Sequence, residues 1–351
     1  MGEAMRIKAR EGDFIENHEG AIFDVKGLVH PTDEIVAFIR YFPNEEGERK
    51  KGKTAYQKVY SLSRRFVILK EKFPQYLIHD HVFDETLCEV PVQDVKKHHR
   101  PSERLQEIRE SDRPDALESR VLQLTDLLAE RANIQMENIG ISGSLLVKLH
   151  KPSSDIDVII YGSENCLNVR STLADLFKDK NSPVRPYNEK GLRGLFDFRS
   201  KDTLMSFESF VRIESNKMMQ GKFLDTDYFV RFVKDWNEVD EKYGDVQYKN
   251  MGHARIEATV IDDSQAIFTP CSYRIEDTVF LEGPEFGPVT EVTSFRGRFC
   301  EQAKVGERIV ARGKIEHVHD RRDSSEHYRL LVGNNYEDFL VPQVNGLFLS
   351  K

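Results

Sequence analysis

Tryptophan, cysteine and long apolar runs are all scarce in this sequence. Its 351 residues include one tryptophan and four widely scattered cysteines, Cys88, Cys166, Cys271 and Cys300. No CxxC pair exists, which excludes a zinc ribbon, and the scatter does not suggest a disulfide framework. No apolar run approaches the roughly 18 residues that a membrane-spanning helix needs. The charged N-terminal segment lacks the apolar core of a signal peptide. These absences favour a cytoplasmic protein with free thiols and no membrane partner.

An excess of basic residues is also missing. The 51 Lys and Arg residues are outnumbered by 59 Asp and Glu residues, so the formal charge is −8. A protein that coats nucleic acid needs a broad basic surface, so any nucleic-acid site here must be a local patch. With 39% hydrophobic and 31% charged residues, the chain has a globular composition. Its length suggests two or three domains.

The hydrophobic pattern divides the chain into three blocks, which together predict an α+β fold. Residues 1–113 combine alternating segments, such as 34–41, with a helix-like segment, and indicate an N-terminal α+β domain. Residues 114–250 mix short apolar strands with helical spacings, and are expected to form a central domain with a mixed sheet. Residues 251–351 alternate with a period of two and predict a β-rich, barrel-like domain. The first strand of this last block is also a candidate for completing the central sheet.

Besides a short helix after Gly143-Ser144, helices are expected at three places in the central block. Asp115 followed by Glu118 is a capping box, which predicts that a helix begins there. Residues 203–224 show helical spacing, with 217–222 as the expected end of that helix. The apolar residues at 229, 232, 233 and 236 recur at i, i+3, i+4 and i+7, which also favours a helix.

The segment 139–162 carries the residues with the clearest chemistry. Ile139–Ser142 and Ile156–Tyr161 are expected to be short buried strands. Asp155 and Asp157 are two residues apart, and a strand places such residues on the same face. Two neighbouring carboxylates at the start of an apolar strand repel each other and lose hydration, a cost that a divalent cation removes. Mg²⁺ prefers such oxygen ligands together with phosphate oxygens and water.

The Gly143-Ser144 turn supplies the complementary half of a phosphate site. Glycine allows a backbone to approach a phosphate closely, and the Ser144 hydroxyl is a further donor. The residues that follow are expected to begin a helix, whose N-terminal amides attract anions. One element therefore suits a triphosphate, and the next strand suits the metal that neutralises it.

Gly143-Ser144, ten residues and then Asp155-Ile156-Asp157 resemble the signature of the DNA polymerase β-type nucleotidyltransferase superfamily. That signature has an apolar residue, Gly-Gly or Gly-Ser, roughly nine to thirteen residues, and then Asp-x-Asp/Glu. The whole chain also resembles a group of uncharacterised archaeal nucleotidyltransferase-like proteins, through residues 25–31, 267–273 and 294–316. The resemblance implies a central nucleotidyltransferase domain that uses Mg²⁺ or Mn²⁺ and transfers a nucleoside monophosphate from an NTP to a hydroxyl group.

The superfamily also implies a third carboxylate, on a neighbouring strand, as a metal ligand or general base. Glu257 is the best candidate, because it shares the polar face of an expected strand with His253, Arg255 and Thr259. Asp262 and Asp263 at the end of the same strand are rivals. Asp197 is a weaker rival, in a segment that has the pattern of a short strand.

A transferase of this kind also needs cations for the triphosphate. The candidates are Lys148, just after the Gly-Ser turn, and three residues of the expected 203–224 helix region, Arg212, Lys217 and Lys222. Residues 44–53 are rich in Lys and Arg and predict an exposed hairpin tip. That tip would guide a polyanionic acceptor if it lay beside the site.

Several functions remain open at the level of sequence. The acceptor is expected to be RNA of a tRNA-like kind or another nucleic acid. One alternative is a non-catalytic nucleic-acid-binding protein on the same scaffold, with the C-terminal block as an oligonucleotide-binding barrel. Another is an antitoxin-like enzyme that modifies a protein. The histidine pairs at 79/81, 98/99 and 317/319 lack further ligands at zinc-site spacing and are expected to be ordinary histidines.

Overall fold

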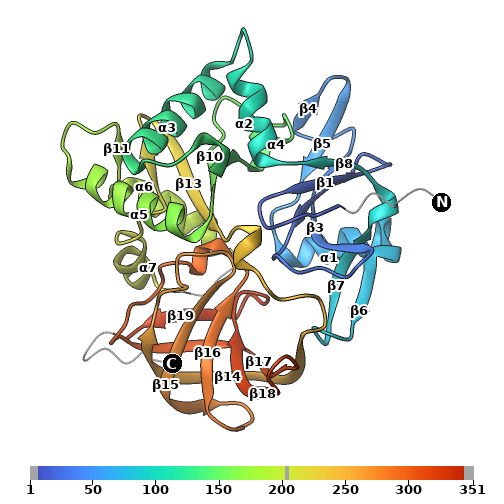
Figure 1. The fold of residues 1–351 in the computed structure, drawn as a ribbon, viewed down its shortest axis with the longest axis vertical. Coiled ribbons are helices and arrows are strands. Elements are labelled where there is room, and N and C mark those ends of the chain that lie inside the picture. The colour runs from blue at the N-terminus through green and yellow to red at the C-terminus, as the bar shows by residue number, and fades with distance from the viewer. Residues whose placement is uncertain (1–6, 202–204, 344–351) are drawn as a thin grey trace. The chain divides into compact units, whose positions relative to one another are not determined.

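The structure is a computed structural model that describes residues 7–201 and 205–343. It is an α+β protein with three β-sheets, one in each block of the sequence (Figure 1). The chain forms two compact units. Of the described residues, the first comprises 7–78, 87–187 and 218–240, and the second comprises 79–86, 188–201, 205–217 and 241–343. No helix of the described ranges is long and apolar enough to cross a membrane.

The first sheet has eight strands and belongs almost entirely to the first unit. Its main path runs β4-β5-β3-β2-β1-β8, and β7 joins β3 to β6. The helix α1 (Leu62–Lys72) contributes Leu69 to the core beneath this sheet. The expected strand at 34–41 is confirmed. The expected hairpin at 44–53 is confirmed in part: the segment includes strand β4 of the β4–β5 hairpin, but Arg49 within it is buried rather than exposed. The strands are β1 (Phe14–Asn17), β2 (Ile22–Val25), β3 (Glu34–Pro43), β4 (Arg49–Lys51), β5 (Thr54–Lys58), β6 (Leu77–Asp80), β7 (Glu85–Pro91) and β8 (Val95–His99).

The second sheet, also in the first unit, contains the Asp-x-Asp strand. Its order is β11-β12-β13-β10-β9; β10 and β13 are parallel, and the other neighbours are antiparallel. Its strands are β9 (Ile139–Ile141), β10 (Ile156–Tyr161), β11 (Val184–Arg185), β12 (Gln220–Phe223) and β13 (Thr226–Val233). The helices of this region are α2 (Pro101–Arg109), α3 (Ala116–Ala132), α4 (Gly143–Leu146) and α5 (Ser163–Lys178). The capping box that begins α3 at Asp115 is confirmed.

Three expectations for the central block are wrong. Residues 226–233 form strand β13 rather than a helix, because β-branched and aromatic residues alternate there between buried and half-buried positions. Of the expected helix at 203–224, only Phe207–Glu214 is helical (α7), and 220–223 is strand β12. Residues 203 and 204 lie outside the described part of the chain. The segment around Asp197 is the helix α6 (Glu189–Arg199) rather than a strand.

The third sheet lies in the second unit and closes into a barrel of five strands. The path β14-β15-β16-β18-β17 returns to β14, while β19 pairs with β17. Its strands are β14 (Val246–Asp262), β15 (Cys271–Glu282), β16 (Val289–Ser294), β17 (Arg308–Asp320), β18 (Ser325–Leu331) and β19 (Phe339–Pro342). The strand β14 therefore completes this barrel and not the central sheet. Short 3₁₀ turns lie at Pro74–Tyr76, Val92–Asp94, Met136–Asn138, Trp236–Glu238 and Gly297–Phe299.

Candidate functional site

The Gly-Ser turn lies directly against the Asp-x-Asp strand. β9 and β10 are antiparallel, with Ile141 opposite Val158, and the Ser142 amide donates a hydrogen bond of 2.8 Å to the Asp157 carbonyl. Gly143 has a φ of +62°, and a Cβ atom there would lie 1.9 Å from Oδ2 of Asp157. Both the backbone conformation and the available space therefore require glycine at this position. The turn leaves the Asp157 carboxylate in contact with bare backbone.

Asp155 and Asp157 lie on the same face of the sheet. Asp155 is exposed and Asp157 is half-buried, whereas Ile156 and Val158 point into the apolar core. Burial, and after it the negative charge of Asp155, raise the pKa of the Asp157 carboxyl to about 7. Nearby cations, of which Arg231 has the largest influence, act in the opposite direction. The pair thus concentrates negative charge in a place that favours a cation.

Ser144 and Lys148, the predicted anion-binding residues that follow the glycine, lie in different surroundings. Ser144 is 3% exposed, and its carbonyl accepts the Leu149 amide at 2.9 Å. Lys148 is exposed, and its ammonium pairs with Glu107 at 3.0 Å. The helix α4 that begins at Gly143 has four residues, so its dipole is small.

The other three predicted cations all have partners within the protein. Arg212 donates to the carbonyl of Pro342 within the second unit. Lys217, also in the second unit, is buried, pairs with Glu214 at 2.9 Å and donates to Gln302 at 2.8 Å. Lys222 lies on β12 in the Asp157 sheet, where it pairs with Asp227 at 2.9 Å.

Glu257 is not on a strand that neighbours β10, which corrects the expectation for the third carboxylate. It lies on β14, whose partners are β15 and β17, and its carboxylate accepts a hydrogen bond of 2.7 Å from Arg308. Asp262 and Asp263 end the same strand and accept the amides of Ser264 and Val305.

Asp227 is a carboxylate on the neighbouring strand that the sequence did not single out. It lies on β13, which runs parallel to β10 with Asp157 opposite Phe229. Two residues before Phe229, Asp227 is on the face of Asp155 and Asp157. Its side chain is 48% exposed. The alternation of buried and half-buried residues in 226–233 is typical of a strand and could have identified it. The same apolar residues also fit a helical spacing, which led to the wrong prediction.

Cations of the first sheet also lie near the carboxylate pair, in the same unit. The positive charges of Lys58 and Arg40 lower the pKa of Asp157, and both aspartates in turn raise that of Lys58. Burial is nevertheless the larger influence on Lys58 and lowers its pKa to about 8. The sequence did not predict these cations as ligand-binding residues, because a long stretch of chain separates them from the motif.

The histidine and acidic clusters have structural explanations. Among the described residues, one set has metal-ligand spacing, namely Asp115, Glu118 and His150. Asp115 and Glu118 form the capping box of α3, and His150 hydrogen bonds Asp115 at 2.7 Å. His98 and His99 hydrogen bond Asp13 and Glu16 separately. All four cysteines are buried free thiols, as expected.

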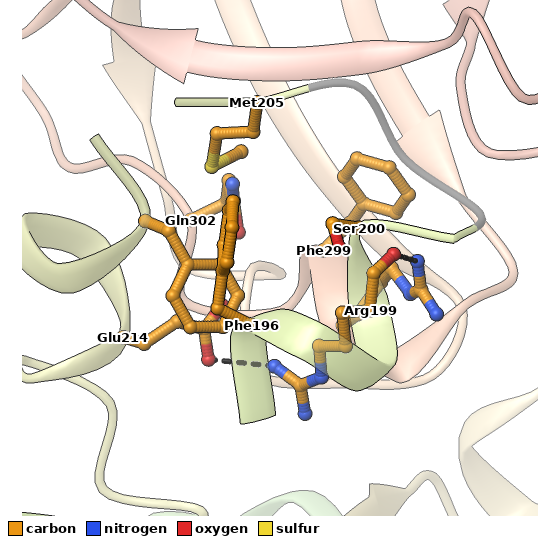
Figure 2. Close-up of a pocket in the computed structure, with 9 residues that line it drawn as sticks. Phe196, Arg199, Ser200, Met205, Glu214, Phe299 and Gln302 are labelled. Carbon is orange, nitrogen blue, oxygen red and sulfur yellow. Dashed lines mark hydrogen bonds and ion pairs between the residues drawn. The ribbon is translucent and has the colours of Figure 1, made fainter. Parts of the chain in front are cut away.

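A small pocket lies in the second unit (Figure 2). The carboxylate pair belongs to the first unit and does not line it. The rings of Phe196 and Phe299 and the side chain of Met205 line it, and the buried Glu214 pairs with Arg199 at 2.6 Å at its edge. Because the Glu214 carboxylate is already bound by Arg199 and Lys217, this network stabilises the packing of α6 and α7.

The fold and site define an α+β protein with a pair of carboxylates beside a glycine turn. The chain is 36% identical over 343 residues to the uncharacterized protein MJ1086 of Methanocaldococcus jannaschii, a match that covers 95% of this chain and 98% of its relative. The chain belongs to the family of that archaeal protein. No protein-family model and no solved structure matches the chain.

Proposed function

We propose that this protein is a metal-dependent nucleotidyltransferase that moves a nucleoside monophosphate from a nucleoside triphosphate to a hydroxyl group and releases pyrophosphate. The observation that carries the proposal is the close approach of Gly143 to the Asp157 carboxylate. A Gly-Ser turn held against an Asp-x-Asp strand places bare backbone beside two carboxylates. That arrangement suits a triphosphate and its metal better than it suits a purely structural turn, which would not require two unpaired aspartates.

The aspartates fit Mg²⁺ or Mn²⁺ as ligands. Both are oxygen donors on one strand face, and no ion pair neutralises either of them among the described residues. A bound divalent cation would relieve their mutual repulsion and stabilise charge on the transferred phosphoryl group. The absence of a Cβ atom on Gly143 leaves room for the Asp157 carboxylate itself, so the turn and this ligand lie in contact.

Asp227 replaces Glu257 as the proposed third carboxylate. It shares the sheet face of the pair, and Lys222 holds its side chain in place. In this role it would orient the acceptor hydroxyl or accept its proton, which increases the nucleophilicity of the oxygen. Asp155 and Asp157 would serve chiefly as metal ligands.

The C-terminal barrel supports a nucleic acid as the acceptor. Oligonucleotide-binding folds are likewise barrels of five strands. The same feature supports the second candidate, a nucleic-acid-binding protein without turnover. However, several arginines of the barrel pair with carboxylates, for example Arg308 with Glu257 and Arg312 with Glu337, which weakens attraction to phosphates.

The test is transfer of label from each α-labelled NTP, with Mg²⁺ or Mn²⁺, to RNA, DNA and protein offered together. We expect wild type to transfer label to RNA and Asp155→Asn/Asp157→Asn to transfer none. Asp225→Asn, an exposed residue of the β12–β13 turn, is the matched control and should retain activity. RNA binding that survives the double substitution, without transfer by wild type under any condition, would instead support the binding protein. Label on protein would identify a protein-modifying enzyme.

A further inference from the structure

Two cations of the first sheet lie in the electrostatic field of Asp155 and Asp157 without pairing with them. Lys58 ends β5, and Arg40 is on β3. Among the described residues neither side chain forms an ion pair. The Lys58 ammonium lies 4.7 Å from the centroid of the Tyr60 ring, and Arg40 donates to the Val59 carbonyl at 3.1 Å. Both side chains are half-buried.

The face of the first sheet that carries Lys58 packs on the segment between the two halves of the motif. Lys58 is paired with Tyr41 across β5 and β3, so the two side chains share a face. Tyr41 and Tyr56 on this face pack with three residues of the segment that follows Gly143, which are Leu146, Val147 and Leu149.

A second contact fixes the end of that segment next to Asp155. Arg49 of the adjacent strand β4 donates to the Leu149 carbonyl and to the Ser154 hydroxyl, each at 3.1 Å. Arg49 is buried, so this is a rigid contact rather than a solvated one. The segment predicted to be an exposed hairpin tip, residues 44–53, therefore contains a buried anchor beside the motif.

Unlike Lys58 and Arg40, other cations near the site have carboxylate partners. Lys148 pairs with Glu107, Lys222 pairs with Asp227, and Arg231 pairs with the buried Glu11. Lys58 and Arg40 instead repel each other, and Lys58 is stabilised by the distant charges of the two aspartates. Two half-buried like charges without a carboxylate partner are unfavourable, and this arrangement points to an anionic ligand.

We propose that Lys58 and Arg40 bind the triphosphate of the nucleotide whose metal is held by Asp155 and Asp157. A metal-bound triphosphate is complementary to both sets, because its metal faces carboxylates while its outer oxygens accept charge-assisted hydrogen bonds from cations. The N-terminal sheet is then part of the active site rather than a separate accessory domain. This inference rests on the proposed function and names the residues that select its substrate.

The experiment measures binding of ATP and of inorganic tripolyphosphate to the full chain in the presence of Mg²⁺. Lys58→Met and Arg40→Met keep the apolar stems and remove the charges. Each is expected to weaken both ligands by about 10-fold or more, because one charge-assisted contact is lost. Lys50→Met, an exposed position on the neighbouring strand β4, should bind both ligands like wild type. Lys58→Arg should recover most of the affinity, and thermal unfolding verifies that each variant is folded.

The outcomes separate this inference from the proposed function. If Lys58→Met and Arg40→Met bind both ligands as tightly as wild type, while Asp155→Asn/Asp157→Asn loses them, the phosphate assignment is wrong and the proposed function stands. If wild type binds neither ligand at millimolar concentration, both fail. Equal weakening by Lys50→Met would show a general charge effect and would also overturn the assignment. Should Lys58→Met not fold, Arg40→Met and Lys58→Arg decide the matter.

Discussion

A Cβ atom on Gly143 would lie 1.9 Å from Oδ2 of Asp157, so the turn and the carboxylate cannot both keep their places around any larger residue. We therefore expect Gly143→Ala to displace the Asp157 side chain and to reduce Mg²⁺-dependent nucleotide binding by at least about 10-fold. The positive φ of Gly143 adds strain of about 1 kcal/mol for alanine. Calorimetric titration with ATP and Mg²⁺ would measure the loss of affinity.

Gly194→Ala is the control for that prediction. Gly194 lies in α6, where a Cβ atom would meet nothing within 4 Å. Alanine should stabilise this helix by about 0.5–1 kcal/mol and leave nucleotide binding unchanged. A Gly143→Ala protein that binds nucleotide as well as Gly194→Ala would contradict the role given to the turn.

Asp157→Asn is expected to stabilise the metal-free protein while abolishing transfer. The pKa of Asp157 is raised to about 7 by burial and by Asp155, so above pH 7 the folded state carries an unfavourable charge that the unfolded chain tolerates. Removal of that charge should increase the free energy of unfolding by about 1–2 kcal/mol at pH 8, allowing for partial exposure. Urea unfolding without metal measures this gain.

Mg²⁺ provides the second half of the same experiment. At concentrations tenfold above its dissociation constant it should stabilise wild type by about 1.4 kcal/mol. The Asp157→Asn protein should gain much less. Equal stabilisation of the two proteins would mean that Mg²⁺ binds elsewhere, and a destabilised Asp157→Asn would mean that the carboxylate has a structural role.

The motif could be predicted from sequence because its parts are local. Gly143 lies just after β9, and Asp157 lies on β10, the next strand along the chain and the antiparallel neighbour of β9. The capping box of Asp115 spans a single turn of helix. Strand alternation likewise revealed most of the C-terminal barrel. These features depend on neighbours in the chain, which a single sequence displays.

The partners of the motif could not be predicted, because they depend on strand register. Phe229, Phe232 and Val233 fit a helical face as well as a strand, so the strand that carries Asp227 was not recognised. Lys58 lies on the first sheet, not on the sheet of the motif. Tyrosines on its face of the first sheet pack on the segment that follows Gly143. No pattern within either segment reports that packing.

Asp227 and Glu257 are the two candidates for the third carboxylate, and substitution of each has a different expected effect. Asp227 shares a sheet with Asp157, whereas Glu257 pairs with Arg308 in the barrel. We expect Asp227→Asn to reduce kcat by 100-fold or more, about the range of a lost general base, and to leave KM for NTP nearly unchanged. Glu257→Gln should keep its activity within about twofold, since its ion pair is partly exposed. Initial rates over a range of NTP concentrations give kcat and KM for both variants. The reverse pattern would restore Glu257 as the candidate.

His30 provides a prediction about pH that is independent of the candidate site. Its Nε2 donates to the Ala9 carbonyl at 3.1 Å, while its Nδ1 accepts the Val36 amide at 3.3 Å. The ring must therefore be neutral, and burial lowers its pKa from 6.5 to about 4. Between these two pH values the unfolded chain binds a proton that the folded protein does not, so the free energy of unfolding falls as the pH decreases.

His30→Gln should remove this part of the pH dependence, because glutamine does not titrate. The wild type is expected to lose about 1–2 kcal/mol more than His30→Gln between pH 7 and pH 4.5. His18→Gln, at an exposed position, serves as the control and should follow wild type. Urea unfolding at both pH values gives the comparison. Equal losses of unfolding free energy in wild type and His30→Gln would contradict this prediction. They would show that the folded protein tolerates a protonated His30 ring next to the Val36 amide, and that carboxylates alone set the acid sensitivity.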